Sequence, residues 1–147
     1  HELYGYELFM TEEGADCFHC HGGAASPLFT TNLYYNNGKD SIFTGEYEDD
    51  RDRYHVTNRE FDRGSYRAPT LRNLKYTAPY MHDGRFKTVD EVINFYSTEV
   101  VNTKYTDVLM HHAASGGVHL TPNALKAFLN TLNDDDFITD ERFSSPW

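Results

Sequence analysis

Both cysteines of this chain lie in one five-residue segment, Cys17-Phe18-His19-Cys20-His21, and this segment constrains the fold more than any other feature. A C-x-x-C-H segment is typical of covalent c-type haem attachment. One short helical turn places two thiols beneath the two vinyl groups of a single porphyrin, and the adjoining histidine directs its imidazole to the iron. The segment therefore predicts one covalent haem c, bound through Cys17 and Cys20, with His21 as the proximal iron ligand.

Three other interpretations compete with haem attachment: a redox dithiol, half of a zinc site, and a chance pattern. A zinc site needs two further Cys or His ligands at close spacing. A thioredoxin-like dithiol needs a strand before it and a helix after it. The sequence shows neither context and has no third cysteine, which favours haem attachment. Covalent haem c is assembled outside the cytoplasm, so we expect a periplasmic or otherwise extracytoplasmic protein.

Length and charge limit the number of domains and the kinds of partner that the chain can have. A chain of 147 residues suits one compact domain. It carries 13 Lys and Arg against 23 Asp and Glu, a formal charge of −10, which disfavours nucleic acid or an anionic membrane as a partner. No apolar run approaches the roughly 18 residues of a membrane span, so no span is expected. The chain begins without Met, and we expect a processed product or a piece of a longer protein.

Three helices are predicted from hydrophobic spacing and capping residues. The first covers residues 2–13 and ends near Gly14, after which Asp16 is expected to cap the turn that carries the cysteines. The second follows the capping box of residues 88–91, with Val89, Val92, Ile93 and Tyr96 on one face.

The third helix begins with Thr121 as N-cap and Pro122 at its first position, and it ends at residues 133–136. Its apolar face comprises Leu125, Phe128, Leu129 and Leu132. Residues 22–66 are polar and rich in Gly, Asn and Asp, which predicts irregular wrapping around a cofactor. No strand pattern of convincing length occurs, so the expected fold class is all-α: a cytochrome-c-like haem domain with long irregular loops.

Two motifs in the middle of the chain resemble motifs of a known protein family. They are Arg67-Ala68-Pro69-Thr70-Leu71-Arg72-Asn73 and Thr77-Ala78-Pro79-Tyr80-Met81-His82-Asp83-Gly84. In this order the motifs resemble the C-terminal haem domain of the bacterial di-haem cytochrome c peroxidases and of their relative MauG. The likeness extends from the C-x-x-C-H segment to the Asp140-Glu141-Arg142-Phe143 tail, and so covers nearly the whole chain. The family has a second haem on an N-terminal domain with its own C-x-x-C-H segment. The resemblance therefore implies that residues 1–147 are a single haem domain, the C-terminal half of a longer di-haem protein.

The resemblance also assigns the distal side of the haem. It places Tyr96 at the position of the distal iron ligand, where the peroxidases have Met and MauG-type proteins have Tyr. Tyr ligation implies a low-potential haem that stores oxidising equivalents, whereas Met ligation implies an electron-entry haem. Helical spacing alone favours a core tyrosine whose hydroxyl bonds to backbone. Met81 is the foremost alternative ligand, although a pocket-lining role is the other interpretation; the remaining alternatives, Met110, His111 and His112, are expected at the surface.

Further site residues follow from the same motifs. Arg67 and Arg72 are candidates for neutralising the haem propionates, with structural ion pairs as the alternative. His82 is expected either near the haem or at the start of a helix. In the family, backbone carbonyls of the Thr-Ala-Pro motif bind calcium at the junction of the two haem domains, which corresponds here to Thr77 and Pro79.

The resemblance implies a hydrogen peroxide-dependent oxidoreductase. In such enzymes peroxide reacts at the N-terminal haem, while this domain transfers electrons or stores oxidising equivalents, so the isolated chain is expected to be weak or inactive. The implied partners are the N-terminal haem domain, hydrogen peroxide, and a small electron-donor protein or protein substrate. The alternative is a free-standing mono-haem electron carrier without catalysis. A third interpretation, a haem sensor, requires that Tyr96 does not bind the iron.

Overall fold

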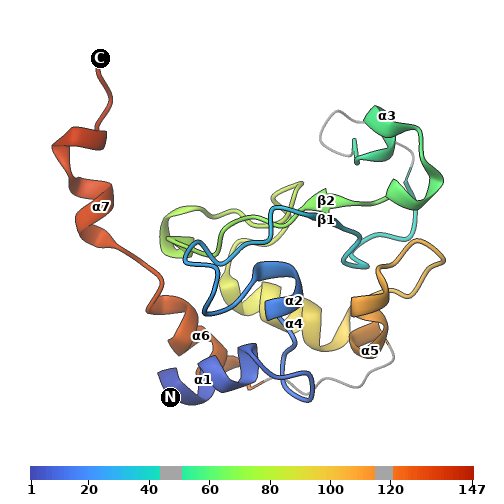
Figure 1. Cartoon of the computed structure of the whole chain (residues 1–147), viewed down its shortest axis with the longest axis horizontal. Helices are drawn as coiled ribbons and strands as arrows, with labels where there is room; N and C mark the ends of the chain where they lie inside the picture. Colours follow the sequence, from blue (N-terminus) through green and yellow to red (C-terminus); the bar gives the residue numbers. More distant parts are fainter. Residues whose placement is uncertain (44–50, 115–120) are drawn as a thin grey trace.

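Helices and long loops make up most of the computed structural model, which describes residues 1–43, 51–114 and 121–147. Figure 1 shows α1, α4 and α6 gathered on one side of the body, with the loops and a small sheet across the other. The α-helices are α1 (Glu2–Phe9), α2 (Phe18–His21), α3 (Tyr54–Thr57), α4 (Val89–Thr98), α5 (His111–Ala114), α6 (Pro122–Asn130) and α7 (Asp135–Thr139). The 3-10 helices are η2 (Glu60–Asp62), η3 (Leu74–Tyr76), η4 (Val108–Met110) and η5 (Glu141–Phe143).

The described residues also contain one small sheet that the sequence analysis did not predict. Strand β1 (Tyr34–Tyr35) pairs antiparallel with β2 (Tyr66–Arg67), with Tyr34 opposite Arg67. Each strand has two residues, which is too short for an alternating pattern to be detected in a sequence. The chain is thus helix-rich as predicted, but the expectation of an all-α domain is met only in part.

The hydrophobic core forms where α1 crosses α6. A methyl group on Gly5 would lie 1.9 Å from the carbonyl oxygen of Ala124, so only glycine permits this close approach of the two helices. The buried cluster around the crossing comprises Phe9, Phe29, Ile93, Leu125, Phe128 and Leu132. The predicted start of the last helix is confirmed, with Thr121 as N-cap and Pro122 in its first turn. The predicted apolar face is confirmed as well: Leu125 and Phe128 of α6 belong to this cluster, as does Leu132 just after the helix, and Leu129 packs against it.

Two helices end earlier than predicted. α1 ends at Phe9 because the chain folds back and the carbonyl of Leu8 accepts from the N–H of Ala15 at 2.7 Å, the bond that a longer helix would receive from Glu12. α6 ends at Asn130, and Asp134 caps a further helix by accepting from the N–H of Phe137. The aspartates at residues 134–136, which were expected only to end α6, thus form the start of α7.

The segment that carries α7 and η5 projects from the body (Figure 1). It is joined to η3 through Asp135, which accepts hydrogen bonds from Lys75 at 3.4 Å and from the hydroxyl of Tyr76. The rings of Phe137 and Phe143 lie 4.8 Å apart and are largely exposed. Within the described ranges, no helix is long and apolar enough to span a membrane.

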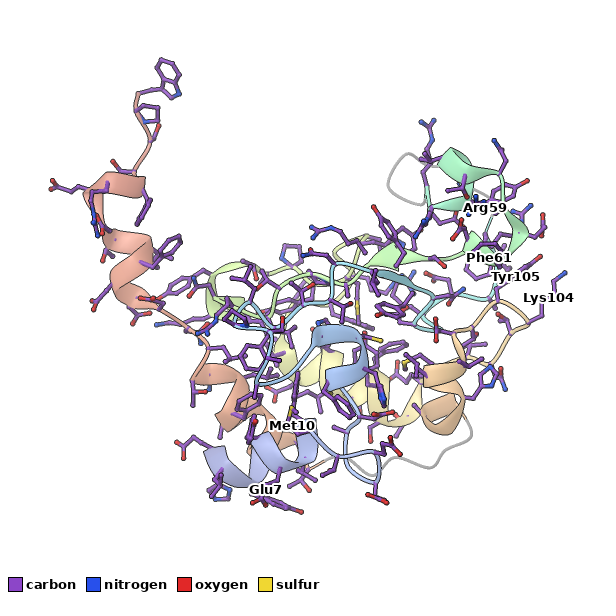
Figure 2. The ribbon with its side chains drawn as sticks, viewed as in Figure 1. Glu7, Met10, Arg59, Phe61, Lys104 and Tyr105 are labelled. Carbon is purple, nitrogen blue, oxygen red and sulfur yellow. The ribbon has the colours of Figure 1, made fainter. Side chains whose placement is uncertain are left out.

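The segment from α3 to η2 is joined to the loop after α4. Figure 2 shows Arg59 and Phe61 beside Lys104 and Tyr105, away from Glu7 and Met10 of the α1 region. The hydroxyl of Tyr105 donates to Glu60 Oε2 at 3.0 Å, while the ammonium of Lys104 lies 4.7 Å from the Tyr105 ring. The Tyr105–Glu60 hydrogen bond thus joins the loop that follows α4 to η2.

Candidate haem-binding site

A cavity of about 530 Å³ lies between α2, α4 and the two motif loops. This volume is in the range of cofactor pockets, roughly 300–1,000 Å³. Its walls are mainly apolar and include Val89, Val92, Ile93, Leu109, Leu125 and Leu129. The cavity is also lined by Cys17, Cys20, His21, Met81 and Tyr96. The arrangement suits a large, flat, apolar group that is held at its edge by thiols.

The two cysteine thiols lie at the cavity wall and are not joined in a disulfide. Burial raises the pKa of each thiol to about 12, and the nearby carboxylates of Asp16 and Asp107 add to the shift. Both are therefore protonated at neutral pH, which disfavours a reactive redox dithiol because the thiolate is the nucleophile. In the described part of the chain, no three Cys, His, Asp or Glu side chains gather as a metal site would require. The site accordingly fits covalent haem attachment better than a redox dithiol or a zinc site.

His21 is held with one ring nitrogen available to the cavity. Its Nδ1 lies 3.1 Å from the carbonyl oxygen of Pro69, an acceptor, so Nδ1 carries the proton and Nε2 has a free lone pair. Burial lowers the pKa of the imidazole, which outweighs the opposite effect of the Pro69 and Phe29 carbonyls. The neutral ring is the form that ligates a metal. Pro69 was not among the predicted site residues, although it lies in the first motif.

The predicted cap of the cysteine turn is wrong. α2 has Cys17 as N-cap and no side-chain cap. Asp16 has a left-handed backbone, with φ of 52°, and its Oδ1 lies 2.5 Å from Nδ1 of His19. In this conformation the carboxylate binds the imidazole instead of the backbone N–H groups of the turn.

The capping box of α4 forms as predicted. The Thr88 hydroxyl accepts from the N–H of Glu91 at 3.2 Å, and the Glu91 carboxylate accepts from the N–H of Thr88 at 2.8 Å. This start sets the rotation of the helix, and all four residues of the predicted apolar face line the cavity. The helix therefore places Tyr96, one turn from Val92, within the same cavity as the cysteines.

The Tyr96 hydroxyl has a side-chain partner instead of the expected backbone partner. Asn37 Nδ2 donates to Tyr96 Oη at 3.1 Å, and the same nitrogen lies 3.8 Å from Sδ of Met81. Burial raises the pKa of Tyr96 to about 12, partly offset by the Asn37 hydrogen bond. One amide thus contacts both candidate distal ligands. Asn37 was missed in the sequence, where Asn-Gly at residues 37–38 signals only a turn.

Met81 and His82 lie in a tight loop closed by pairing of Tyr80 with Phe86. Met81 has a left-handed backbone, with φ of 70°. His82 lines the cavity and stacks on Tyr66 with ring centroids 3.6 Å apart. His82 does not start a helix, because α4 begins at Val89, which leaves the prediction that His82 lies near the haem.

The carboxylate of Asp83 fastens the same loop to the rest of the chain. It accepts from the ammonium of Lys39 at 2.9 Å and from Arg85 at 2.8 Å. Burial alone would raise the pKa of Asp83, but the Lys39 and Arg85 hydrogen bonds prevail and hold it at about 2. Lys39 is buried and also contacts Asp40 at 2.7 Å. This ion-pair network lies next to the loop that carries Met81.

Arg67 and Arg72, the candidates for the haem propionates, line the cavity, and so do Thr77 and Pro79, the predicted calcium-binding residues. Arg67 donates to Asn32 Oδ1 at 2.7 Å, and Arg72 donates to a backbone carbonyl at 2.8 Å. Among the described residues, neither guanidinium forms an ion pair of the kind given as the alternative. The described residues supply no acidic cluster for calcium, so binding at the Thr77 and Pro79 carbonyls stays a prediction.

The expected surface position of residues 110–112 is wrong for Met110. This residue ends η4 and lines the cavity, because the loop after α4 returns to the site. His111 is exposed as predicted, and the side chain of His112 lies outside the described part of the structure.

Several known proteins are similar to this chain. No family model matches the chain. The cytochrome-c peroxidase IdrP1 of Denitromonas iodatirespirans is 35% identical over 63% of this chain and 30% of its own length. The crystal structure of a MauG-like protein associated with microbial copper homeostasis is 31% identical, with a TM-score of 0.74 over 99% of this chain and 50% of that protein. The homologues of this chain are cytochrome c peroxidases and MauG-like proteins.

This finding confirms the resemblance carried by the two motifs. The di-haem peroxidase BthA from Burkholderia thailandensis has the same fold, with a TM-score of 0.62 over 93% of this chain at 22% identity. The chain spans half or less of each compared protein, namely 30% of IdrP1, 50% of the MauG-like protein and 43% of BthA. What those whole proteins do is therefore carried over only as a proposal.

Proposed function

We propose that this chain is the C-terminal haem domain of a hydrogen peroxide-dependent di-haem peroxidase of the cytochrome c peroxidase or MauG type. The observation that carries the proposal is one cavity lined by Cys17, Cys20, Tyr96 and His21, whose Nδ1 is hydrogen-bonded to the Pro69 carbonyl. Homology to peroxidases and MauG-like proteins supports it. The domain serves electron transfer or the storage of oxidising equivalents for a partner domain.

The roles of the residues follow from their chemistry. A haem supplies one-electron redox chemistry at its iron. Cys17 and Cys20 hold it by thioether bonds, and His21 donates Nε2 to the iron. Tyr96 is the distal ligand, because its oxygen is a hard anionic donor that favours ferric iron, and Met81 is the alternative ligand. Arg67 and Arg72 bind the propionates, for which paired Arg donors are suited, and His82 lines the haem pocket.

The partners of the domain follow from the same proposal. The N-terminal haem domain of the same protein reacts with hydrogen peroxide, and a small electron-donor protein or a protein substrate exchanges electrons with the enzyme. Thr77 and Pro79 bind calcium through backbone carbonyls once the partner domain adds its ligands. Because haem c is attached outside the cytoplasm, the protein is periplasmic or otherwise extracytoplasmic.

Peroxide turnover tests this division of labour. The purified holo-domain, which has one haem, is expected to show little peroxidase activity with a reduced cytochrome as donor. The longer protein that contains a second C-x-x-C-H segment is expected to turn over peroxide rapidly. Rapid turnover by the isolated domain would contradict the proposal. A gene in which a signal peptide directly precedes His1 would instead support the mono-haem electron carrier.

The ferric absorption and EPR spectra test the distal ligand. Tyr96→Phe is expected to change both spectra, whereas Met81→Leu and the matched control Met110→Leu leave them as in the unmodified domain. A methionine-type near-infrared band that disappears in Met81→Leu would reassign the ligand to Met81. An unchanged spectrum in all three variants would support the sensor interpretation with an open sixth position.

A further inference from the structure

The segment that carries Asn37 is a tight turn fixed at its backbone. Asn36 Oδ1 accepts from the N–H of Gly38 at 2.9 Å, and Asn37 Oδ1 accepts from the N–H of Lys39 at 3.2 Å. Gly38 has φ of 70°, and a methyl group there would lie 2.7 Å from Val101 O. The N–H of Val101 donates in turn to the carbonyl of Gly38 at 2.8 Å. The turn is therefore pinned against the chain that follows α4.

This arrangement determines which end of the Asn37 amide contacts the candidate ligands. Because Oδ1 already accepts from the backbone of Lys39, the amide must present its NH₂ group to Tyr96 and Met81. The two hydrogens of Nδ2 suffice for one bond to each side chain. An oxygen at 3.1 Å is a normal acceptor, whereas a thioether sulfur at 3.8 Å is a weak one.

We propose that Asn37 is a positioning residue that makes Tyr96, and not Met81, the distal ligand of the haem. The inference rests on the proposed function. A phenolic oxygen that bound ferric iron would release its proton to solvent and carry negative charge, so the N–H donated to it would become a charge-assisted hydrogen bond. The sulfur of a bound methionine stays neutral and gains no such bond. The same amide thus stabilises one ligand and gives almost nothing to the other, a preference that Asn37 imposes through its NH₂ group.

Two substitutions in the holo-domain test this role. Asn37→Leu removes the amide at nearly constant size, and Asn37→Asp keeps the acceptor for the Lys39 N–H but replaces the donor with a second acceptor. In both variants we expect most of the Tyr96-dependent ferric spectrum to be lost and a methionine-type near-infrared band to appear. The reduction potential is expected to rise, because a thioether favours ferrous iron. Adding Met81→Leu to Asn37→Leu should remove the new band.

The controls separate positioning from general damage. Asn94→Leu, an exposed substitution on α4, should leave the spectrum and the potential unchanged. If Asn37→Leu does not fold, Asn37→Asp carries the test alone. The inference would be overturned if the folded Asn37 variants had the spectra and potential of the unmodified domain while Tyr96→Phe changed them. That result would leave the proposed function intact. If Tyr96→Phe itself changes nothing, the ligand assignment is wrong and the inference fails with it.

Discussion

The residues on the two sides of the proposed haem differ in how the chain assembles them. The proximal group, Cys17, Cys20 and His21, lies within five consecutive residues of one helical turn. The distal group, Asn37, Met81 and Tyr96, comes from a turn, a loop and a helix that are separated by up to 59 residues. A local motif therefore carries its own geometry, whereas the distal group exists only once the whole domain has folded.

This difference implies that damage to the two groups has different consequences. In the proposed site, Cys17 and Cys20 bind the cofactor covalently, so their loss should remove the covalent attachment of the haem altogether. The distal group is held by hydrogen bonds and packing, so changes there alter the ligand or the stability by degrees.

The largest effect is expected from the proximal cysteines. Replacing both, as Cys17→Ser with Cys20→Ser, should abolish covalent haem, because a serine hydroxyl does not add to the vinyl groups. Haem staining after denaturing electrophoresis measures the result. His19→Ala is the matched control within the same turn, since Nδ1 of His19 lies 2.5 Å from Asp16 Oδ1, and it should retain covalent haem. Covalent haem in the double variant would refute the attachment site.

The next effect concerns the core that supports both groups. Phe128 is buried where α1 meets α6, and its ring lies 5.2 Å from that of Phe9. Phe128→Ala should lower the free energy of unfolding by about 3–5 kcal/mol, through lost burial and the cavity left behind. Urea denaturation of the domain measures this value. Phe137→Ala on the projecting α7 is the control and should cost less than about 0.5 kcal/mol. Equal losses would mean that the core is elsewhere.

The contrast between the groups also explains what the sequence predicts. The attachment segment, the capping box at Thr88 and the start of the last helix at Thr121 are local signals, and the structure forms the elements that they predict. The face of α4 follows from helical periodicity, so Tyr96 was placed correctly on the buried side. Arg67, Arg72 and His82 were predicted as site residues from the family motifs, and all three line the cavity.

The missed features depend on contacts between distant segments. The β1–β2 ladder has two residues per strand, and the bond from His21 to the Pro69 carbonyl joins residues 48 positions apart. Asn37 and Met110 line the cavity. The loops that carry them are joined to each other by bonds between distant residues, from the N–H of Val101 to the Gly38 carbonyl and from the N–H of Asp107 to the Asn36 carbonyl. α1 ends early because its last carbonyls bond to residues of the next turn. No periodicity in the sequence reports such bonds.

A pH effect is expected in the loop of the distal group. The pKa of Asp83 is held at about 2, so its ionised form stabilises the folded chain above the ordinary carboxyl pKa, and this contribution is lost as the pH falls from about 4 towards 2. Asp83→Asn should therefore be less stable than the unmodified domain at pH 7, and the difference should shrink in acid. Chemical denaturation from pH 7 to pH 2.5 measures it. A difference that is constant with pH would exclude the Lys39 and Arg85 contacts as its source.

The smallest effect tests the helix that carries Tyr96. Thr88→Ala removes the hydroxyl that caps the N–H of Glu91, and should lower the free energy of unfolding by about 1 kcal/mol. Thr98→Ala, at the exposed end of α4, is the control and should change it by less than about 0.5 kcal/mol. Because the cap lies two turns from Tyr96, the ferric spectrum of Thr88→Ala should stay unchanged. A spectral change would show that the distal group depends on the start of α4 and not only on the contacts around Asn37.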